Sequence, residues 1–528
     1  MLDNLNNQTR IILATVLSFL FFATYDYFFI PKNVKNPTAV VDKNSTKEIK
    51  SKESTNVTTS TTQKVPEQKS AINSNAKNDV IFTLKAKNYE LKIDKLGRIS
   101  KFYLNEKKYT TPEGERLQLV NDELGFLPLE IRFSDEGVNL EAFSTRYNST
   151  MSEASLDGKP LSIVLTQKLK DVTVKKELKF YPDGHYDLKV LLDKGLEYYI
   201  TPGYHPSLAK DSYTFHGALI KKSDDTMEII DDGDAEPVTY NGAKFAANAD
   251  KYYATVLYNF KDGMDVVVSP IKDGIPSLFV KGKKEFNLGG YIGPKEFVKL
   301  NKINPQLTDV IEYGFFTFIS KPMFVFLTYL YNLLGNWGWA IVALTIVIRL
   351  ILFPLTYKGM VSMNKMKALS PKVKELQQKY KDDKQKLNAH MMELYKKHGA
   401  NPMGGCLPML LQIPVFFAIY RVLQNSVELK GAPWILWIHD LAVMDPYFIL
   451  PVLMGISMFI QQKLSPNNFT DPTQEKIMKF LPLIFTFFFV TFPAGLTLYW
   501  FVSNLFSIAQ QYYVNKLFEK QDALKAKK

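Results

Sequence analysis

The feature that most restricts the fold of this chain is a series of long apolar runs between residues 323 and 515, separated by short polar loops. A helix of about 20 apolar residues spans the hydrocarbon core of a bilayer. The runs therefore predict a polytopic α-helical membrane protein with a five-helix core over residues 336–515. The predicted spans of this core are 338–357, 406–426, 447–461, 480–492 and 495–514.

The distribution of lysines orients this core. The loop over residues 358–401 carries 11 lysines against four acidic residues, whereas the loop over 427–446 has one lysine. The tail over 516–528 is again rich in lysine. Cytoplasmic loops of membrane proteins carry an excess of lysine and arginine, so the first loop and the C-terminus are expected in the cytoplasm. The same bias accounts for the net charge of +12.

A further apolar run, residues 11–30, lies near the N-terminus. No small-residue cleavage site follows it, which favours an uncleaved transmembrane signal anchor over a signal peptide that is removed. Residues 1–10 are then cytoplasmic, and residues 31–335 lie mainly on the other side of the membrane. Residues 31–78 are rich in Ser, Thr, Asn and Lys. Such a segment buries too little apolar surface to offset its ordering entropy, and it is predicted to be a flexible linker.

Residues 79–319 show a different pattern, in which short runs alternate apolar and polar residues, as in YDLKVLL at 186–192. Turn signals such as Asn241-Gly242 separate the runs. Alternation with this spacing predicts an all-β sandwich domain. The region has no phosphate loop and no His/Cys cluster with metal-ligand spacing, so no cofactor or metal is expected. Its three scattered histidines are expected to be structural: His185, His205 and His216.

The segment 320–335 carries helix boundary signals, with Pro322 near its start and Gly335 after its end. It is apolar and contains several aromatic residues. We expect an interfacial amphipathic helix that lies along the membrane surface before the first core span.

The lysine-rich loop contains a predicted cytoplasmic helical hairpin over 360–400. Apolar residues recur every three or four positions from 363 to 380 and again from 387 to 394, on either side of two aspartates. This spacing predicts two antiparallel helices packed along their apolar stripes. Lysines cover the outer faces, which are either simply solvated or a docking platform for the ribosome, targeting factors or lipid headgroups. The lysines of this platform are Lys372, Lys374, Lys379, Lys381, Lys384 and Lys386.

One arginine, Arg349, falls inside the first core span. A charge at this depth costs roughly 2.5 to 3.5 kcal/mol on insertion scales, so its side chain must face a partner or water. The other four core spans contain no Asp or Glu, which favours a water-filled pocket over a buried ion pair. Polar residues in the spans either line such a groove or tie helices together. The predicted groove residues are Arg349, Thr345, Gln412, Trp500, Ser503, Ser507 and Gln510.

A positive pocket inside a helical bundle suits two kinds of guest. One is the polar segment of a nascent chain that must cross the membrane, and the other is a small anion, which would make the chain a transporter. Transporters usually contain internal repeats, and none is visible in the five spans. A membrane enzyme would need a nucleophile with a base or a metal cluster. The pair His439-Asp440 alone suggests one, and it is expected to be structural.

Several dense motifs occur in order through the core, among them IVIRLILFPLT at 346–356, NPMGGCLPMLLQIPVFFAIY at 401–420 and FPAGLTLYWFVSN at 492–504. With the segments around them, residues 336–515 resemble the YidC family of membrane protein insertases. The anchor followed by a large β domain is similar to the Gram-negative form of this family, in which that domain is periplasmic.

The resemblance implies a non-enzymatic insertase and chaperone of inner-membrane proteins, which acts alone or with the Sec translocon. Arg349 would be the arginine of a hydrophilic groove. Substrate helices would pass beside the third and fifth spans counted from the anchor, near Phe416, Phe417 and Trp500. Family members often have Tyr at the position of Trp500. Nascent membrane proteins, the Sec translocon, the ribosome with its targeting factors, and membrane lipids are the implied partners.

Overall fold

The structure is a computed structural model of the chain. It describes residues 79–111, 113–120, 125–206, 214–381, 383–401, 407–465 and 472–526. Residues 1–10, the predicted anchor 11–30, the predicted linker 31–78 and the last two residues of the basic tail lie outside the described residues. The chain divides into two compact units, residues 1–311 and 312–528, and each is described by itself.

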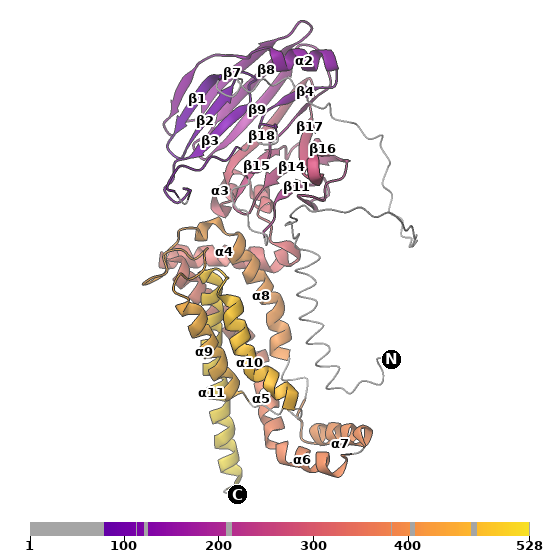
Figure 1. The fold of residues 1–528 in the computed structure, drawn as a ribbon, viewed down its shortest axis with the longest axis vertical. Coiled ribbons are helices and arrows are strands. Elements are labelled where there is room, and N and C mark those ends of the chain that lie inside the picture. Colours follow the sequence, from indigo (N-terminus) through magenta and orange to yellow (C-terminus); the bar gives the residue numbers. More distant parts are fainter. Residues whose placement is uncertain are drawn as a thin grey trace, which may run out of the picture. The chain divides into compact units, whose positions relative to one another are not determined.

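The first unit is rich in β-strands, as the alternating pattern predicts, and its described strands form three sheets (Figure 1). The four-stranded sheet has the order β3 (Ile99–Leu104), β2 (Tyr89–Asp94), β1 (Val80–Ala86) and β6 (Glu153–Leu156). The five-stranded sheet has the order β13 (Val238–Ala243), β16 (Met264–Pro270), β17 (Pro276–Lys281), β10 (Tyr198–Ile200) and β4 (Ile131–Phe133). The nine-stranded sheet has the order β12 (Met227–Asp231), β11 (Gly217–Lys221), β14 (Phe245–Ala249), β15 (Tyr253–Tyr258), β18 (Glu285–Pro294), β9 (His185–Leu192), β8 (Thr173–Phe180), β7 (Leu161–Lys168) and β5 (Asn148–Ser149).

The pairing is antiparallel except between β1 and β6, which run parallel. Two short α-helices also occur, α2 (Glu136–Ser144) and α3 (Phe297–Ile303). The helix α2 begins after Asp135, whose carboxylate accepts a hydrogen bond from the Val138 N–H. This capping signal was not used in the prediction of strands, so α2 was not predicted.

Strand β8 shows how the alternation builds the core. Every second residue of this strand is buried, because successive side chains of a strand point to opposite faces of the sheet. At its end the Phe180 ring stacks on Phe82 of β1, with 6.4 Å between ring centroids. The contact packs the four-stranded sheet against the nine-stranded one.

A lysine occupies one of these inward positions. Lys176 is fully buried, and its Nζ donates hydrogen bonds to the backbone oxygens of Gly97 (2.9 Å) and Leu129 (2.7 Å). Its Nζ also lies 4.6 Å from the ring centroid of Tyr147. Burial disfavours the charged ammonium and lowers the pKa of Lys176 to about 7.

We predict that this lysine makes the stability of the β-rich unit depend on pH. Because the pKa of Lys176 is lower in the folded chain than in the unfolded chain, the unfolded state binds more protons between about pH 7 and pH 10. The free energy of unfolding should therefore rise with pH across this window, by up to about 1.4 kcal/mol per pH unit. The urea midpoint for protease resistance of this unit in the full-length protein measures the effect. Lys176→Met should remove this component of the slope, and an unchanged slope would contradict the prediction.

The second unit is helical, and each predicted core span coincides with a helix in the described residues. The spans correspond to α5 (Trp337–Ala368), α8 (Leu407–Asn425), α9 (Ile449–Leu464), α10 (Pro472–Phe489) and α11 (Ala494–Ala526). Within the described part of the chain, α5 is the one helix long and apolar enough to cross a membrane by length and composition. Residues 449–464 and 479–489 form shorter apolar helices, so a core with five spans stays a prediction.

The expected interfacial helix is α4 (Thr317–Leu334), which begins one turn earlier than the predicted segment. It ends at Gly335, whose φ of 69° places it in the left-handed region that glycine adopts without strain. Its buried residues Ser320, Phe324, Leu327 and Leu330 share one face. This face packs on the bundle, since the Ser320 hydroxyl donates to the Ala418 oxygen of α8.

The predicted hairpin corresponds to α6 (Ser370–Lys379) and α7 (Lys384–Lys397), which lie side by side (Figure 1). The helix breaks between α5, which ends at Ala368, and α6, which begins at Ser370, where the pair Ser370-Pro371 predicts a helix start. Pro371 explains the break, since proline has no N–H and its ring clashes with the carbonyl four residues earlier. Between the arms, the Tyr380 and His390 rings stack with centroids 4.8 Å apart.

The loop over 427–446 is tied to the helix ends beside it. The Asn336 side chain caps α5 and also donates to the backbone oxygens of Pro433 and Trp434. Backbone bonds join the start of α11 to the same loop, from Ala494 N to Val443 O (2.7 Å) and from Gly495 N to Leu441 O (2.9 Å). The loop therefore forms a fixed cover over this end of α5 and α11.

Candidate functional site

The centre of the candidate site is the buried guanidinium of Arg349, in the middle of α5. Arg349 is 9% exposed. Its Nε donates to the Ser503 hydroxyl of α11 over 2.8 Å, and Nη2 donates to the same oxygen. Among the described residues Arg349 forms no ion pair. A hydroxyl on the facing helix thus takes the place of the carboxylate that a buried cation usually has.

Three more predicted groove residues lie on α11 with Ser503. Ser507 and Gln510 are buried, as Ser503 is. The Ser507 hydroxyl donates to the backbone oxygen of Ser503 (3.0 Å), and the Gln510 side chain donates to the backbone oxygen of Arg349 (3.5 Å). Trp500 is partly buried one turn earlier on the same helix. The helical spacing seen in the sequence therefore places this polar row against α5.

Gln412 of α8 joins Arg349 at the wall of a small cavity. The cavity has a volume of about 10 Å³, roughly the space for one water molecule. Two of its polar lining residues, Thr356 and Tyr499, are not among the groove residues predicted from the sequence. Helical spacing would have found both, because Thr356 lies two turns after Arg349 and Tyr499 lies one turn before Ser503.

Thr345 and Asn504 belong to the packing of the helices more than to this cavity. Thr345 is fully buried, and its hydroxyl donates to the Ile341 oxygen of its own helix (2.7 Å). Asn504, beside Ser503 in sequence, donates instead to the Ser457 hydroxyl of α9 (3.2 Å). Polar residues in the spans therefore act in both of the ways considered from the sequence.

Two of the three predicted substrate-contact residues lie together. Phe416 meets Trp500 edge to face, with centroids 4.7 Å apart and an interplanar angle of 86°. Phe485 and Phe489 of α10 complete this aromatic cluster around Trp500. The Phe417 ring has its centroid 5.8 Å from that of Phe416, but it stacks on Phe316 at 5.7 Å.

The predicted docking lysines lie on the hairpin surface. Five of them are exposed, and the side chain of Lys384 lies outside the described part of the chain. Lys386 is 3.2 Å from Asp383, the residue that caps α7. The exposed lysines are Lys372, Lys374, Lys379, Lys381 and Lys386.

The described residues offer little for covalent or metal chemistry. Within them, no group of three or more His, Cys, Asp or Glu side chains has the geometry to hold a metal ion. The Asp440 carboxylate accepts a hydrogen bond from the Ala442 N–H (2.8 Å), and His439 beside it is exposed. In this pair, Asp440 therefore stabilises a turn. The polar groups around Arg349 are suited to binding a polar ligand.

Comparison with known proteins covers nearly the whole chain. Residues 81–326 match the family model described as YidC periplasmic domain, and residues 329–521 match the model described as 60Kd inner membrane protein. The chain is 51% identical to the membrane protein insertase YidC of Campylobacter jejuni, over 98% of both chains. It is 50% identical to that of Wolinella succinogenes, over 100% of this chain and 98% of the other. A crystal structure titled active YidC insertase with the first transmembrane domain resolved is 19% identical, with a TM-score of 0.37 over 82% of this chain and 95% of that one.

We predict that removing the Ser503 hydroxyl destabilises the helical unit. Ser503→Ala leaves the Arg349 guanidinium without its acceptor, which should lower the free energy of unfolding by about 1 to 3 kcal/mol. Thermal unfolding of the full-length protein in detergent measures this loss. Ser507→Ala is the matched control, since that hydroxyl bonds only within its own helix, and its effect should be smaller. Combining Ser503→Ala with Arg349→Met should recover stability; a double variant as weak as Ser503→Ala would contradict the explanation.

Proposed function

Because the chain belongs to the YidC family of membrane protein insertases, we propose that it inserts and helps to fold inner-membrane proteins through a groove around Arg349. It acts alone or with the Sec translocon. The observation that carries this proposal is the buried Arg349, which a hydroxyl holds and which no described carboxylate neutralises. A buried positive charge that no carboxylate neutralises attracts the acidic or polar segment of a client protein.

In the proposed mechanism, Arg349 and the polar groups around it lower the cost of bringing a polar segment part of the way across. Those groups are the side chains of Gln412, Ser503, Ser507 and Gln510. Their hydroxyl and amide groups replace part of the water that the segment loses, as preformed hydrogen-bond partners do in any site poor in water.

The apolar helix of the client leaves the groove along an aromatic face. Phe416 and Trp500, which are in contact, form this face, and Phe417 extends it on the neighbouring side of α8. Each CH₂ group that moves from water into lipid contributes about 0.8 kcal/mol. The transfer itself therefore drives insertion, and the mechanism needs neither a nucleotide nor a cofactor.

The proposed topology has both termini in the cytoplasm and residues 31–335 mainly in the periplasm. The count of 11 lysines against four acidic residues over 358–401 supports it. The hairpin α6–α7 and the basic tail then face the cytoplasm. We assign them to docking of the ribosome and its targeting factors, and to contact with anionic lipid headgroups.

We predict that Arg349→Ala slows insertion in cells depleted of the wild-type protein. The client is a small single-span protein with an acidic outer tail, and protease accessibility of that tail measures its insertion. The rate should fall about fivefold or more, the factor that corresponds to roughly 1 kcal/mol of lost attraction. Arg349→Lys keeps the charge and should retain part of the activity.

Arg146→Ala is the control for this experiment, because it removes an exposed arginine of the β-rich unit that pairs with Asp79 at 2.9 Å. It should insert the client as the wild type does. Unchanged insertion of several acidic clients by Arg349→Ala would refute the role of the groove. Small-anion uptake through the same pocket would then be the next measurement, although membership of this family does not favour transport.

We also predict that the hairpin lysines bind the ribosome through their charge. Replacing all six platform lysines, Lys372, Lys374, Lys379, Lys381, Lys384 and Lys386, with Gln should abolish co-sedimentation of the detergent-solubilised protein with ribosomes. Replacing the same six with Arg should preserve it, and raising the salt should weaken it because exposed charges are screened. Equal co-sedimentation of the Gln and Arg variants would exclude an electrostatic docking role.

A further inference from the structure

Residues 312–320, the segment at the start of the helical unit, are joined to the second half of α8 by polar contacts. The Glu312 carboxylate lies 3.6 Å from the Arg421 guanidinium of α8, from Oε2 to Nη1. One turn further along α8, the Asn425 side chain donates to the Glu312 backbone oxygen over 2.5 Å. The side chain of Glu312 is 9% exposed and that of Arg421 is 18% exposed. Water and salt therefore screen this ion pair less than they screen a pair on an open surface.

The same segment also holds α8 through a ring contact and a hydroxyl. The Phe316 ring stacks on Phe417, with centroids 5.7 Å apart and an interplanar angle of 6°. The Ser320 hydroxyl donates to the Ala418 backbone oxygen over 3.2 Å. Phe417 lies four residues before Arg421, so the ring contact and the ion pair are made by one face of α8.

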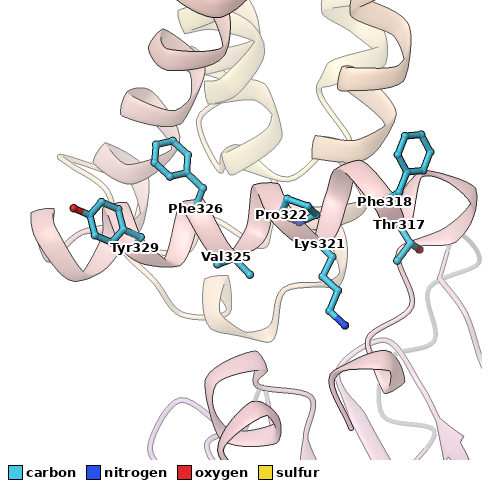
Figure 2. A pocket seen from close by; sticks show the side chains of 7 residues that line it. All are labelled: Thr317, Phe318, Lys321, Pro322, Val325, Phe326 and Tyr329. Carbon is cyan, nitrogen blue, oxygen red and sulfur yellow. The ribbon is translucent and has the colours of Figure 1, made fainter. Parts of the chain in front are cut away.

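The segment is itself fixed to α5, because its last residues belong to α4. Tyr331 of α4 stacks on Trp337 at the start of α5, with centroids 4.1 Å apart. The other side of α4 carries exposed side chains, among them Val325 and Tyr329 (Figure 2). The helix α4 is thus anchored through its buried face. Residues 312–320 therefore place α8 relative to α5, the helix that carries the buried guanidinium.

These contacts decide in which direction Phe416 points. Neighbouring residues of a helix point about 100° apart. Holding Phe417 on Phe316 therefore turns Phe416 toward Trp500 of α11, where the two rings meet edge to face at 4.7 Å. The helix α8 packs more extensively on α4 than on α5 or α11. A rotation of α8 that released its contacts with residues 312–320 would move Phe416 off Trp500.

We propose that Arg421 is a positioning residue for insertion, which fixes the rotation of α8 through its ion pair with Glu312 and so keeps Phe416 on Trp500. The proposal rests on the function proposed above, in which the apolar helix of a client leaves along these two rings. Arg421 acts through Phe416 and does not need to touch the client. It lies within the predicted span 406–426, where a charge is costly unless it has a partner. An arginine at this place therefore serves the packing of α8.

The position of Phe416 can be measured without insertion. The photoreactive analogue p-benzoylphenylalanine replaces Phe416 in the full-length protein, and illumination in detergent joins it to its neighbours, which mass spectrometry of the peptides identifies. Without further changes, the crosslinks should fall mainly on α11 around Trp500. Arg421→Gln and Glu312→Gln should each lower the share on α11 about threefold, the population shift that one partly exposed ion pair supports. Arg421→Lys keeps the charge and should keep most of the crosslinks on α11.

Exchanging the two charges separates the position of α8 from a general loss of stability. Glu312→Arg combined with Arg421→Glu restores an ion pair at this place. The double variant should restore the crosslinks to α11 and the insertion of the acidic client, which each single variant should slow about threefold. The matched control is Arg146→Gln, which breaks the exposed pair with Asp79 in the β-rich unit. It should change neither measurement.

Three results would overturn the proposal: single variants that keep the wild-type crosslinks, an exchanged pair that does not restore them, or an equal effect of Arg146→Gln. Crosslinks that leave α11 in Arg421→Gln while this variant inserts the client at the wild-type rate would also overturn it, because the position of Phe416 would then not matter for insertion. The groove around Arg349 is judged separately. If Arg349→Ala inserts normally while Arg421→Gln shifts the crosslinks and slows insertion, the groove is refuted and the positioning role of Arg421 is supported.

Discussion

The bond between the Arg349 guanidinium and the Ser503 hydroxyl fixes how the two longest described helices, α5 and α11, face each other. Rotating α11 would move Ser503 away from the arginine and would leave the buried charge without this acceptor, which costs about 1 to 3 kcal/mol. Asn504 locks the same rotation from the next face through its bond to Ser457 of α9. Further along, Asn364 of α5 bonds Asn515 of α11 over 3.0 Å. The polar residues of α11 thus order the bundle, and one of them, Tyr499, also lines the cavity beside Arg349.

The two units treat a buried cation in different ways. In the β-rich unit, two backbone oxygens hold Lys176, and loss of a proton relieves the cost of burying it. Arginine has no such escape, since its side chain stays charged in proteins. Arg349 must therefore rely on neighbouring dipoles and on any water in the cavity beside it. A side chain that can lose its charge is compatible with a stable core, whereas a side chain that stays charged is suited to a site that binds a polar ligand.

Patterns of apolar residues predict the elements of both units because they follow from one chain segment at a time. Alternation predicts the β-rich unit, and the apolar runs predict the positions of α5 and α8 to α11. The pair Ser370-Pro371 predicts a helix start, and α6 begins at Ser370. The capping of α2 by Asp135 was also readable, but the alternating pattern around it outweighed this short signal. The inward position of Lys176 was not, because its two acceptors are 79 and 47 residues away.

In the candidate site, too, features within one helix could be predicted from the sequence, whereas contacts between helices could not. Helical spacing within α11 predicts that Ser503, Ser507 and Gln510 share a face, and the structure sets that face against α5. The same spacing includes Tyr499, one turn before Ser503, whereas the part that Gln412 of α8 takes in the cavity wall depends on how the helices pack. The separation of Phe416 from Phe417 has a similar origin. Neighbours on a helix point about 100° apart, and only the positions of Trp500 and Phe316 decide which neighbour each ring meets.

The helix α5 extends from the segment that carries the buried guanidinium to the lysine-rich hairpin. Its 32 residues give a rod of about 48 Å at 1.5 Å per residue, while the hydrocarbon core is about 30 Å thick. More than a third of the rod therefore projects beyond the lipid, and α6 begins directly after its end. Pro354 lies between Arg349 and this projecting part. Because proline removes one backbone hydrogen bond from the helix, the projecting part is joined to the segment that carries the charge through its weakest turn.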